Sequence, residues 1–513
     1  MLVRIASCLL GITLLAGCAS AAPPSMPSVT QPPANPSLAT GPTPRPEPPA
    51  TPKPTEAAST ELPSPPGPQP LAATLPVRGS AWETGREIVL APGLDGMSYV
   101  SIPAADDAVV VLLDADGRPR PGWPIAVPHS TRCFIQGVAD DGSVRAICDA
   151  TDIQQPDWCC DTLRAFAFDP VGRLMRGWPV DVISPESARV IGDQLVVLST
   201  QAFTDTVTTG VASHRSRLVT IAADGAVRSG AEVPMLETMG TDTWAIGPDG
   251  VAYGTESVGE WSDETPTGKE ASRVVAFDAA GPRAGWPVTI DGVASGPAFA
   301  SDGRILVAVG VFDVPRSWIV ALEPAGKGTA VSSATLPLMS ALQPGGLQCN
   351  GYFPIPPLAD ERTVVTSDWV STSEPTWYAL DPALEVLPGW PYKSSQALQW
   401  TGPPAEPGDV DCVLGPPAEP ALASDGTLYL ALAPGSDATG GSLVAVGRDG
   451  AVVPGWPVRL QRAGSGFWSA VVGTDGTVFA LAVEPEAGRK SSATILGIAP
   501  DGTVRWNTTV IEP

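Results

Sequence analysis

The chain has 513 residues, of which 54 are acidic and 30 are Lys or Arg, so its formal net charge at pH 7 is −24. Such acidity repels phosphate backbones and anionic lipid head groups, which excludes nucleic-acid binding and electrostatic adhesion to a membrane surface. Cationic groups or a basic partner fit this charge better, and no cofactor is predicted. The length could hold two or three ordinary domains, but a repeat of fixed period along most of the chain favours one large body.

Residues 1–17 have the form of an export signal. Arg4 precedes an apolar run from Ile5 to Leu15 that is too short to span a bilayer as a stable anchor. The run ends in Leu-Ala-Gly followed by Cys18, a sequence that resembles the lipobox of bacterial lipoproteins. The resemblance implies a diacylated Cys18 at the mature N-terminus and an extracytoplasmic protein held at the cell membrane or the outer membrane. An ordinary secretory signal with an incidental cysteine is the alternative.

Residues 18–75 are predicted to form a disordered, proline-rich linker that begins with the lipidated cysteine. Eighteen of the 58 prolines lie between Pro23 and Pro70, and this stretch has almost no aromatic or branched apolar residue. Such a segment cannot bury enough surface to offset the entropy of ordering. Its proline content favours polyproline II, so it would act as a semi-rigid spacer between the membrane and a folded domain over residues 76–513.

The tripeptide Gly-Trp-Pro recurs five times, and its spacing predicts a repeat of roughly 50 residues. Its tryptophans are separated by 55, 108, 104 and 66 residues, so each of the two longest gaps has room for one more copy. Degenerate copies stand at 230–231 and 319–326, and a final copy ends at Trp506. Eight such units predict an all-β chain folded as an eight-bladed β-propeller. The motif tryptophans are Trp123, Trp178, Trp286, Trp390 and Trp456.

Within each unit, short apolar and β-branched runs alternate with Asp-Gly turns and longer loops, which predicts four antiparallel strands per blade. The first and third connections of a four-stranded meander lie at the same end, so the Asp-Gly turns should share one face of the propeller. The isolated turn aspartates lack the spaced oxygen ligands of a calcium loop, and no metal site is predicted. Binding is expected at the opposite face, on the long connections at 150–162, 201–216, 256–272, 338–357 and 392–417.

The position of the motif tryptophan carries a family resemblance. A tryptophan that opens the outermost strand five or six residues after a turn glycine resembles the docking tryptophan of the pyrroloquinoline-quinone-type propeller repeats. The resemblance covers residues from about 85 to about 510. It implies that each indole, including that of Trp506, packs between neighbouring blades. The proline that follows suits an edge strand, where its missing N–H removes no ladder bond.

The cysteine pattern predicts disulfide bonds, because an even number of cysteines in an exported chain favours them. Cys133 and Cys148 flank a turn almost symmetrically and are expected to bridge a hairpin. The adjacent Cys159 and Cys160 would then close on each other. In the alternative pairing, each of the adjacent cysteines bonds to one of the first two. No cysteine spacing resembles a zinc site.

Cys349 and Cys412 occupy equivalent positions in two long loops and are predicted to bridge them. Aromatic and carboxylate side chains lie in and beside these loops, and together they could bind sugars, cationic groups or peptides. Packing within the loops is the alternative. The residues of this candidate binding face are Tyr352, Phe353, Trp369, Trp377, Trp400, Asp409 and Asp411.

These features favour a membrane-anchored, extracytoplasmic, monomeric propeller that acts as a non-enzymatic binding or scaffold module for an envelope protein or a glycan. In plan it resembles the propeller lipoproteins that serve outer-membrane barrel assembly in bacteria, but its long linker and Gly-Trp-Pro repeat depart from them, so that partner is not carried over. One alternative is a quinoprotein dehydrogenase, since such enzymes carry an adjacent cysteine pair beside the cofactor, like Cys159 and Cys160. A carbohydrate-binding propeller is the other. His129 and His214 lie in expected loops outside any motif, and no catalytic residue is predicted.

Overall fold

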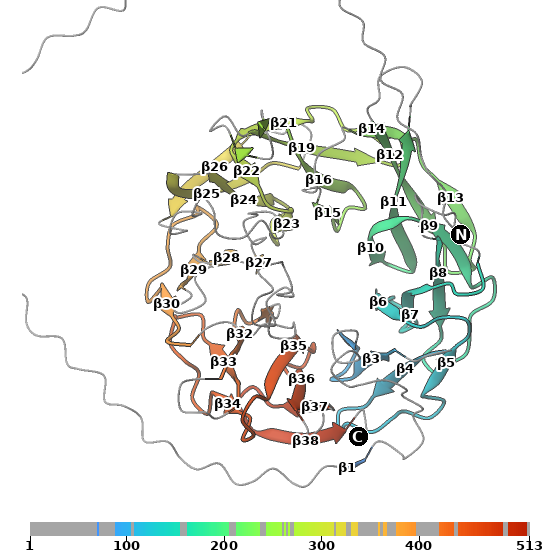
Figure 1. Ribbon diagram of the computed structural model, residues 1–513, viewed down its shortest axis with the longest axis vertical. Coiled ribbons are helices and arrows are strands. Elements are labelled where there is room, and N and C mark those ends of the chain that lie inside the picture. The colour runs from blue at the N-terminus through green and yellow to red at the C-terminus, as the bar shows by residue number, and fades with distance from the viewer. Residues whose placement is uncertain are drawn as a thin grey trace, which may run out of the picture. The chain divides into compact units, whose positions relative to one another are not determined.

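The chain forms two units, Met1–Pro63 and Ser64–Pro513, and the described residues of the computed structural model (Figure 1) belong to the second. Every element among them is a β-strand. The predicted signal peptide, Cys18 and all of the predicted linker except 69–70 lie outside them. The structure describes residues 69–70, 88–103, 107–153, 162–204, 212–235, 243–258, 261–262, 265–266, 271–311, 314–324, 330–336, 358–359, 363–366, 376–396, 420–434, 440–485 and 491–509.

Four sheets follow one another in the first half of the second unit. Sheet 1 holds β2 (Val89–Pro92), β3 (Ser98–Ile102), β4 (Ala108–Leu113) and β5 (Ile125–Val127). Sheet 2 holds β6 (Cys133–Val138), β7 (Val144–Asp149), β8 (Thr162–Phe168) and β9 (Val180–Ile183). Sheet 3 holds β10 (Pro185–Ile191), β11 (Gln194–Thr204), β12 (Ala212–Ile221), β13 (Val227–Ser229) and β14 (Val233–Met235). Sheet 4 holds β15 (Thr243–Ile246), β16 (Ala252–Ser257), β19 (Ala271–Asp278), β20 (Gly281–Pro282) and β21 (Val288–Asp291).

Four more sheets complete this unit, and β17 (Trp261–Ser262) and β18 (Thr265–Pro266) form a separate two-stranded sheet. Sheet 5 holds β22 (Val293–Ala294), β23 (Ala298–Phe299), β24 (Ile305–Val311), β25 (Val314–Leu322) and β26 (Ala330–Leu336). Sheet 6 holds β27 (Leu358–Ala359), β28 (Thr363–Thr366), β29 (Thr376–Leu380) and β30 (Tyr392–Lys393). Sheet 7 holds β31 (Ala421–Leu422), β32 (Leu428–Leu432), β33 (Ser442–Val446) and β34 (Val458–Arg459). Sheet 8 holds β35 (Gly466–Val472), β36 (Val478–Pro485), β37 (Ser491–Ile498), β38 (Val504–Thr509) and β1 (Gln69–Pro70).

The predicted all-β fold of four-stranded antiparallel sheets is confirmed. The strands of these eight sheets pair antiparallel, mostly as a meander, with an edge divided into β13 and β14 in sheet 3, β20 and β21 in sheet 4, and β22 and β23 in sheet 5. One strand departs from this pattern, because β1 pairs parallel with the outermost strand β38, Gln69 opposite Thr508. Residues 69–70, inside the segment predicted to be a disordered linker, thus form an added strand at the edge of sheet 8.

Aspartate side chains build the tight turns, as expected from the Asp-Gly pattern. In eight turns the carboxylate accepts the backbone N–H of the residue two positions further on, and the turn glycine has positive φ. At 114–118 the acceptor is Asp114 rather than Asp116, and it takes the N–H groups of both Asp116 and Arg118. The aspartates of the eight turns are Asp141, Asp224, Asp249, Asp302, Asp425, Asp449, Asp475 and Asp501.

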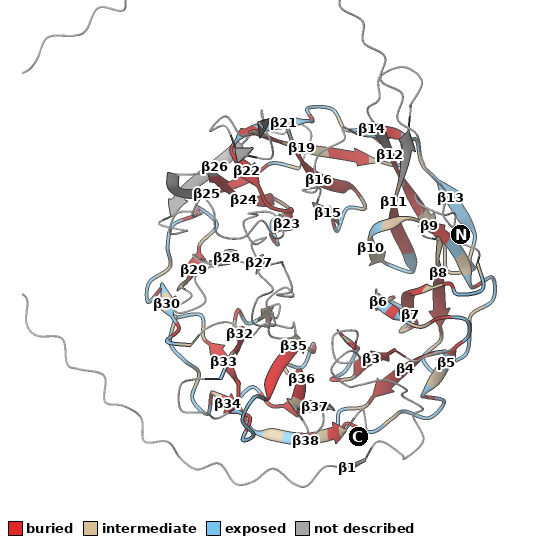
Figure 2. Cartoon of the chain, viewed as in Figure 1, coloured by how far each residue is buried: buried red, intermediate tan, exposed pale blue. Residues whose placement is uncertain are grey.

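The hydrophobic core is divided among the contacts between sheets. Each of eight clusters of buried residues combines two sheets that follow each other in the chain, except that one cluster combines sheet 8 with sheet 1. That cluster brings Leu90 and Val100 together with Phe479 and Trp506. Figure 1 shows the C-terminal strands beside the N-terminal ones, and Figure 2 shows buried residues along the strands of all the sheets.

Candidate functional site

The five motif tryptophans are buried between sheets, and four of them hydrogen-bond to the next sheet, whereas the indole N–H of Trp286 has no partner among the described residues. Their exposed fractions lie between 6% and 9%. The indole Nε1 of Trp178 donates to the carbonyl of Ala223 at 3.0 Å, and that of Trp456 donates to the carbonyl of Pro500 at 2.9 Å. Trp123 and Trp390 make the same bond to Pro170 and Arg448. These bonds position the blade motif for packing and leave no indole face for a ligand.

The glycine of the motif is needed because two backbones meet at this point. Gly177 has a φ of 88°, and a Cβ there would lie 1.9 Å from the carbonyl oxygen of Asp224 in the next sheet. Gly389 and Gly455 would meet Asp449 and Asp501 in the same way. The peptide bond between tryptophan and proline is cis in all five copies. In the degenerate copy, which has no tryptophan, a Cβ at Gly230 would lie 2.8 Å from Ala279 Cα. This copy therefore retains the close approach of the backbones but not the indole.

A second aromatic residue packs on several motif tryptophans, and it was not predicted from the sequence. The rings of Tyr99 and Trp123 meet edge to face with centroids 5.6 Å apart, and those of Tyr253 and Trp286 do the same at 5.6 Å. The aromatic residue stands three positions after the turn glycine on the second strand of its sheet. That spacing recurs in the sequence and could have revealed it. The four pairs are completed by Tyr429–Trp456 and Phe479–Trp506.

Sheet 2 carries Arg145 at this position instead of an aromatic residue. Its guanidinium lies 5.4 Å from the ring centroid of Trp178, and its Nη2 donates to the carbonyl of Asp193 in sheet 3. The side chain is fully buried, and desolvation lowers the pKa of Arg145, partly offset by the charges of Asp141 and Asp193. This buried cation therefore holds sheets 2 and 3 together by a cation–π contact and backbone hydrogen bonds.

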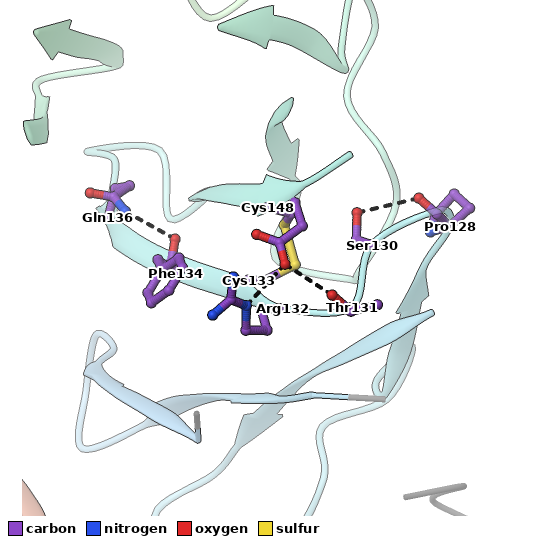
Figure 3. The surroundings of a disulfide bond; sticks show 9 residues. Pro128, Ser130, Thr131, Arg132, Cys133, Phe134, Gln136 and Cys148 are labelled. Atoms are coloured by element: carbon purple, nitrogen blue, oxygen red, sulfur yellow. Dashed lines mark hydrogen bonds and ion pairs between the residues drawn. A yellow bond between two sulfur atoms is a disulfide. The ribbon is translucent and has the colours of Figure 1, made fainter. Parts of the chain in front are cut away.

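At the face opposite the Asp-Gly turns, the structure describes two connections of sheets 1 and 2. There the 128–132 segment between β5 and β6 crosses the start of the connection that follows β7, because Thr151 N–H donates to the carbonyl of His129. Asp149 Oδ2 accepts from Thr131 Oγ1 and from Arg132 Nε, each at 2.9 Å. Figure 3 shows Thr131 and Arg132 beside the disulfide. Two connections distant in sequence are thus joined at one carboxylate.

The disulfide links Cys133 and Cys148, which lie directly opposite each other on β6 and β7. Both residues are buried. This bond leaves no thiol on either cysteine for the alternative pairing to Cys159 and Cys160. The adjacent pair itself lies outside the described residues, as do Cys349 and Cys412.

Arg164 ties the second connection of sheet 2 to its outermost strand. Its Nη1 donates to Asp152 Oδ1 and its Nε to Asp181 Oδ1, each at 2.9 Å. The hydrogen bond with Asp181 is the main reason that the pKa of Arg164 is raised. Desolvation raises the pKa of Asp152, but the hydrogen bond and charge of Arg164 outweigh it, so this pKa is lowered. The connection is therefore anchored on β8 at its start, as a binding loop requires.

Phe134 and Gln136 lie on β6, and Arg132 directly precedes this strand; we call these three residues the β6 patch (Figure 3). Phe134 is 41% exposed and the Arg132 side chain 45% exposed, while the Gln136 amide donates to the carbonyl of Phe134. An exposed aromatic ring, a guanidinium and an amide within five consecutive residues can contact an apolar or hydrogen-bonding ligand. The β6 patch was not predicted, because its exposure depends on the strand's place in the sheet.

The predicted candidate binding face is only partly described. Trp377 lies on β29 with 2% of its surface exposed, in the cluster between sheets 6 and 7 with Trp390 and Leu430. This position makes Trp377 a core residue and corrects the prediction that it belongs to a binding face. Its apolar neighbours on β32 explain the burial. The other members, Tyr352, Phe353, Trp369, Trp400, Asp409 and Asp411, lie outside the described residues.

The described residues contain no group of three or more His, Cys, Asp or Glu side chains placed to hold a metal ion. They also contain no helix long and apolar enough to cross a bilayer. His129 is exposed and has a φ of 57°, and its backbone N–H donates to the Asp107 carboxylate. The side chain of His214 lies outside the described residues.

No protein-family model and no curated protein matches the chain. Among solved structures, a cobalt-substituted apocarotenoid oxygenase of Synechocystis has a TM-score of 0.28 and 12% identity over 49% of this chain and 64% of its own. A prolyl endopeptidase has a TM-score of 0.38 and 11% identity over 83% of this chain and 56% of its own. A eukaryotic initiation factor has a TM-score of 0.39 and 8% identity over 74% of this chain and 88% of its own. This chain spans less than two thirds of the oxygenase and of the endopeptidase. Since all three TM-scores are 0.39 or lower, we transfer no activity from these proteins.

Proposed function

We propose that the eight sheets are blades of one closed β-propeller, and that this propeller is a lipid-anchored, extracytoplasmic module that binds an envelope protein or a glycan without catalysing a reaction. The contact between sheet 8 and sheet 1 supports closure. Trp506 Nε1 donates to the carbonyl of Ala115, and Thr508 Oγ1 donates to that of Gly117, each at 2.9 Å. The bond of Trp506 repeats, between the last and first sheets, the indole-to-carbonyl bond that Trp123, Trp178, Trp390 and Trp456 make between neighbouring sheets.

The contrast between the two ends of the sheets is the observation that carries the binding role. At one end, short turns are held by aspartate side chains and leave little side-chain variety for a ligand. At the other end, Asp149 and Arg164 anchor long connections beside the exposed Phe134. Variable loops on a rigid sheet scaffold are where binding proteins usually place their contacts. The motif tryptophans are buried and engaged in packing between the sheets.

The membrane anchor is tested with Cys18→Ser in the full chain. We expect the unaltered protein to enter the detergent phase on Triton X-114 partition and the variant to stay in the aqueous phase. Equal partition of the two proteins would contradict lipidation at Cys18. Mass spectrometry of the N-terminal peptide is the independent measurement.

The binding role is tested by a glycan array and by cross-linking in intact envelopes, with Phe134→Ser as the altered protein and Val171→Ser as the control. Both side chains are exposed, but Val171 lies at the short-turn end. We expect loss of the captured ligand with Phe134→Ser and retention with Val171→Ser. If the unaltered protein captures neither a glycan nor a protein, yet oxidises alcohols after addition of quinone and calcium, the dehydrogenase alternative replaces this proposal.

A further inference from the structure

The outermost strand of sheet 5 differs from those of the other sheets. In sheets 1, 2, 4, 6 and 7 the motif proline stands immediately before the outer strand, and these strands have two to four residues. In sheet 3 the outer edge is split into the short β13 and β14, and β14 contains Pro234. In sheet 8 the added strand β1 pairs with the edge of β38. Natural proteins use such devices to keep sheet edges from pairing with other chains.

The strand β26 has none of these devices. It has seven residues, Ala330–Leu336, without proline or charge. It pairs with β25 from Ser317 opposite Leu336 to Leu322 opposite Ala330, and its one irregularity lies at the Ala330 end. No other strand among the described residues pairs with it. Alternate residues of an edge strand direct their N–H and C=O groups away from the sheet, so β26 has backbone groups available for a further strand.

The sequence around β26 is free of acidic residues. Between Glu323 and Asp360 there is no Asp or Glu, and Lys327 is the one charged residue, although the whole chain has 54 acidic residues in 513. A body of net charge −24 attracts a basic segment at long range and repels an acidic one. The strand β26 itself contains no charged residue. The edge therefore combines a strand that has one pairing partner among the described strands with an uncharged sequence.

We propose that β26 is a docking edge for an extended, basic segment of a partner protein, which adds to sheet 5 as a further strand by backbone hydrogen bonding. The pairing residues of that segment are uncharged and alternate in the manner of a β-strand, and its flanks carry lysine or arginine. This inference rests on the proposed role as a binding module and names the chemical class of one partner. Sheet 8 provides a precedent in the same chain, since β1 already adds to an outer edge there.

The first test is amide hydrogen exchange of the full chain, read by mass spectrometry over residues 330–336. The probe is a peptide of alternating valine and threonine with two lysines at each end. One control peptide has proline at every second position, and another has glutamate in place of lysine. We expect the lysine probe to slow amide exchange in β26 and the proline probe to leave the exchange rate unchanged. At low salt the glutamate probe should bind at least about tenfold more weakly than the lysine probe. Equal effects of the three peptides, or no protection, would overturn the proposal.

The second test uses Ser332→Pro and Ser333→Pro, which lie opposite Ala321 and Val320. Neighbouring residues direct their N–H groups to opposite sides of the strand, so one substitution removes an outward donor and the other a bond to β25. We expect the variant without the outward donor to keep the thermal midpoint of unfolding and to lose binding of the lysine probe. Retention of the probe by both folded variants would sink the proposal, and if both unfold, the exchange experiment on the unaltered chain decides.

Two further outcomes distinguish a docking edge for a partner segment from self-association of the chain and from the proposed function. If residues 330–336 become protected with rising protein concentration and no peptide, the edge belongs to a second copy of the chain and the peptide proposal is wrong. If an envelope protein or glycan is captured through Phe134 while the probe leaves β26 unprotected, the proposed function stands and this inference alone fails.

Discussion

Single glycines decide how closely neighbouring sheets approach. Gly177→Ala would place a Cβ 1.9 Å from the Asp224 carbonyl oxygen at a φ of 88°. Gly250 has a similar φ of 77°, but a Cβ there meets nothing nearer than 3.7 Å. Gly250→Ala should therefore cost about 1–2 kcal/mol for the left-handed conformation alone. We expect Gly177→Ala to cost at least about 2 kcal/mol more, because the backbones must separate. Urea unfolding measures both, and equal losses would contradict a close approach.

Buried tyrosines make the folded state sensitive to alkaline pH. Burial raises the pKa of Tyr99, Tyr253 and Tyr429 to about 12, with Asp249 adding to the effect at Tyr253 and Arg120 opposing it at Tyr99. Since these values lie above the unfolded pKa of about 10, their stabilisation is present below pH 10 and is lost as the pH rises toward 12.

We expect the tyrosinate absorbance of the native protein to develop at higher pH than that of the urea-unfolded protein. The fall in unfolding free energy between pH 10 and 12 should be shallower in Tyr253→Phe, which has no phenol to ionise there. Coincident titration curves of native and unfolded protein would rule out buried phenols.

At the scale of elements, the hairpin of β6 and β7 is closed by its disulfide. Cys133 and Cys148 are 15 residues apart, and a loop of that size predicts a stabilisation of about 3 kcal/mol. We expect the double replacement by alanine to lose about that much unfolding free energy. Dithiothreitol should lower the stability of the unaltered chain by at least as much. Any loss of stability that dithiothreitol still causes in the double variant would come from disulfides of the other cysteines. A non-reducing digest would show whether Cys349 and Cys412 are joined.

Elements also show where sequence patterns suffice. Strand type and turn chemistry follow from local residues, because an aspartate two positions before a backbone N–H closes its turn wherever the turn lies. The ion pairs of Arg164 with Asp152 and Asp181 were not predictable, since they depend on the register of β8 with β9 and on the path of a connection. Trp377 was misassigned for a related reason. A tryptophan beside a long loop has the same sequence context whether its strand faces solvent or another sheet.

For the whole molecule, closure of the proposed propeller makes a distinct prediction. Trp506→Ala removes an indole buried between sheets 8 and 1, and large-to-small changes of this kind cost about 3–5 kcal/mol. In a closed ring this loss should shift a single transition that fluorescence and circular dichroism report alike. Arg505→Ala, on the same strand but exposed, is the control and should change little.

An open array would respond differently to Trp506→Ala. Sheet 8 would then unfold in a separate, earlier transition, and protease would release the C-terminal segment while the remaining sheets stayed folded. That result would contradict closure and leave the antiparallel sheets themselves unaffected.

The β-strand character, the turn positions and the repeat follow from sequence patterns, because these features depend on residues near one another in the chain. Only the tertiary structure shows which carbonyl accepts the N–H of Trp456 and how Arg145 takes an aromatic position, and it selects the predicted Cys133–Cys148 bond over the alternative pairing with the adjacent cysteines. It also decided that β26 has one pairing partner among the described strands. Such properties depend on the register and packing of segments that are distant in sequence, so they cannot be predicted from residue type and spacing within one segment.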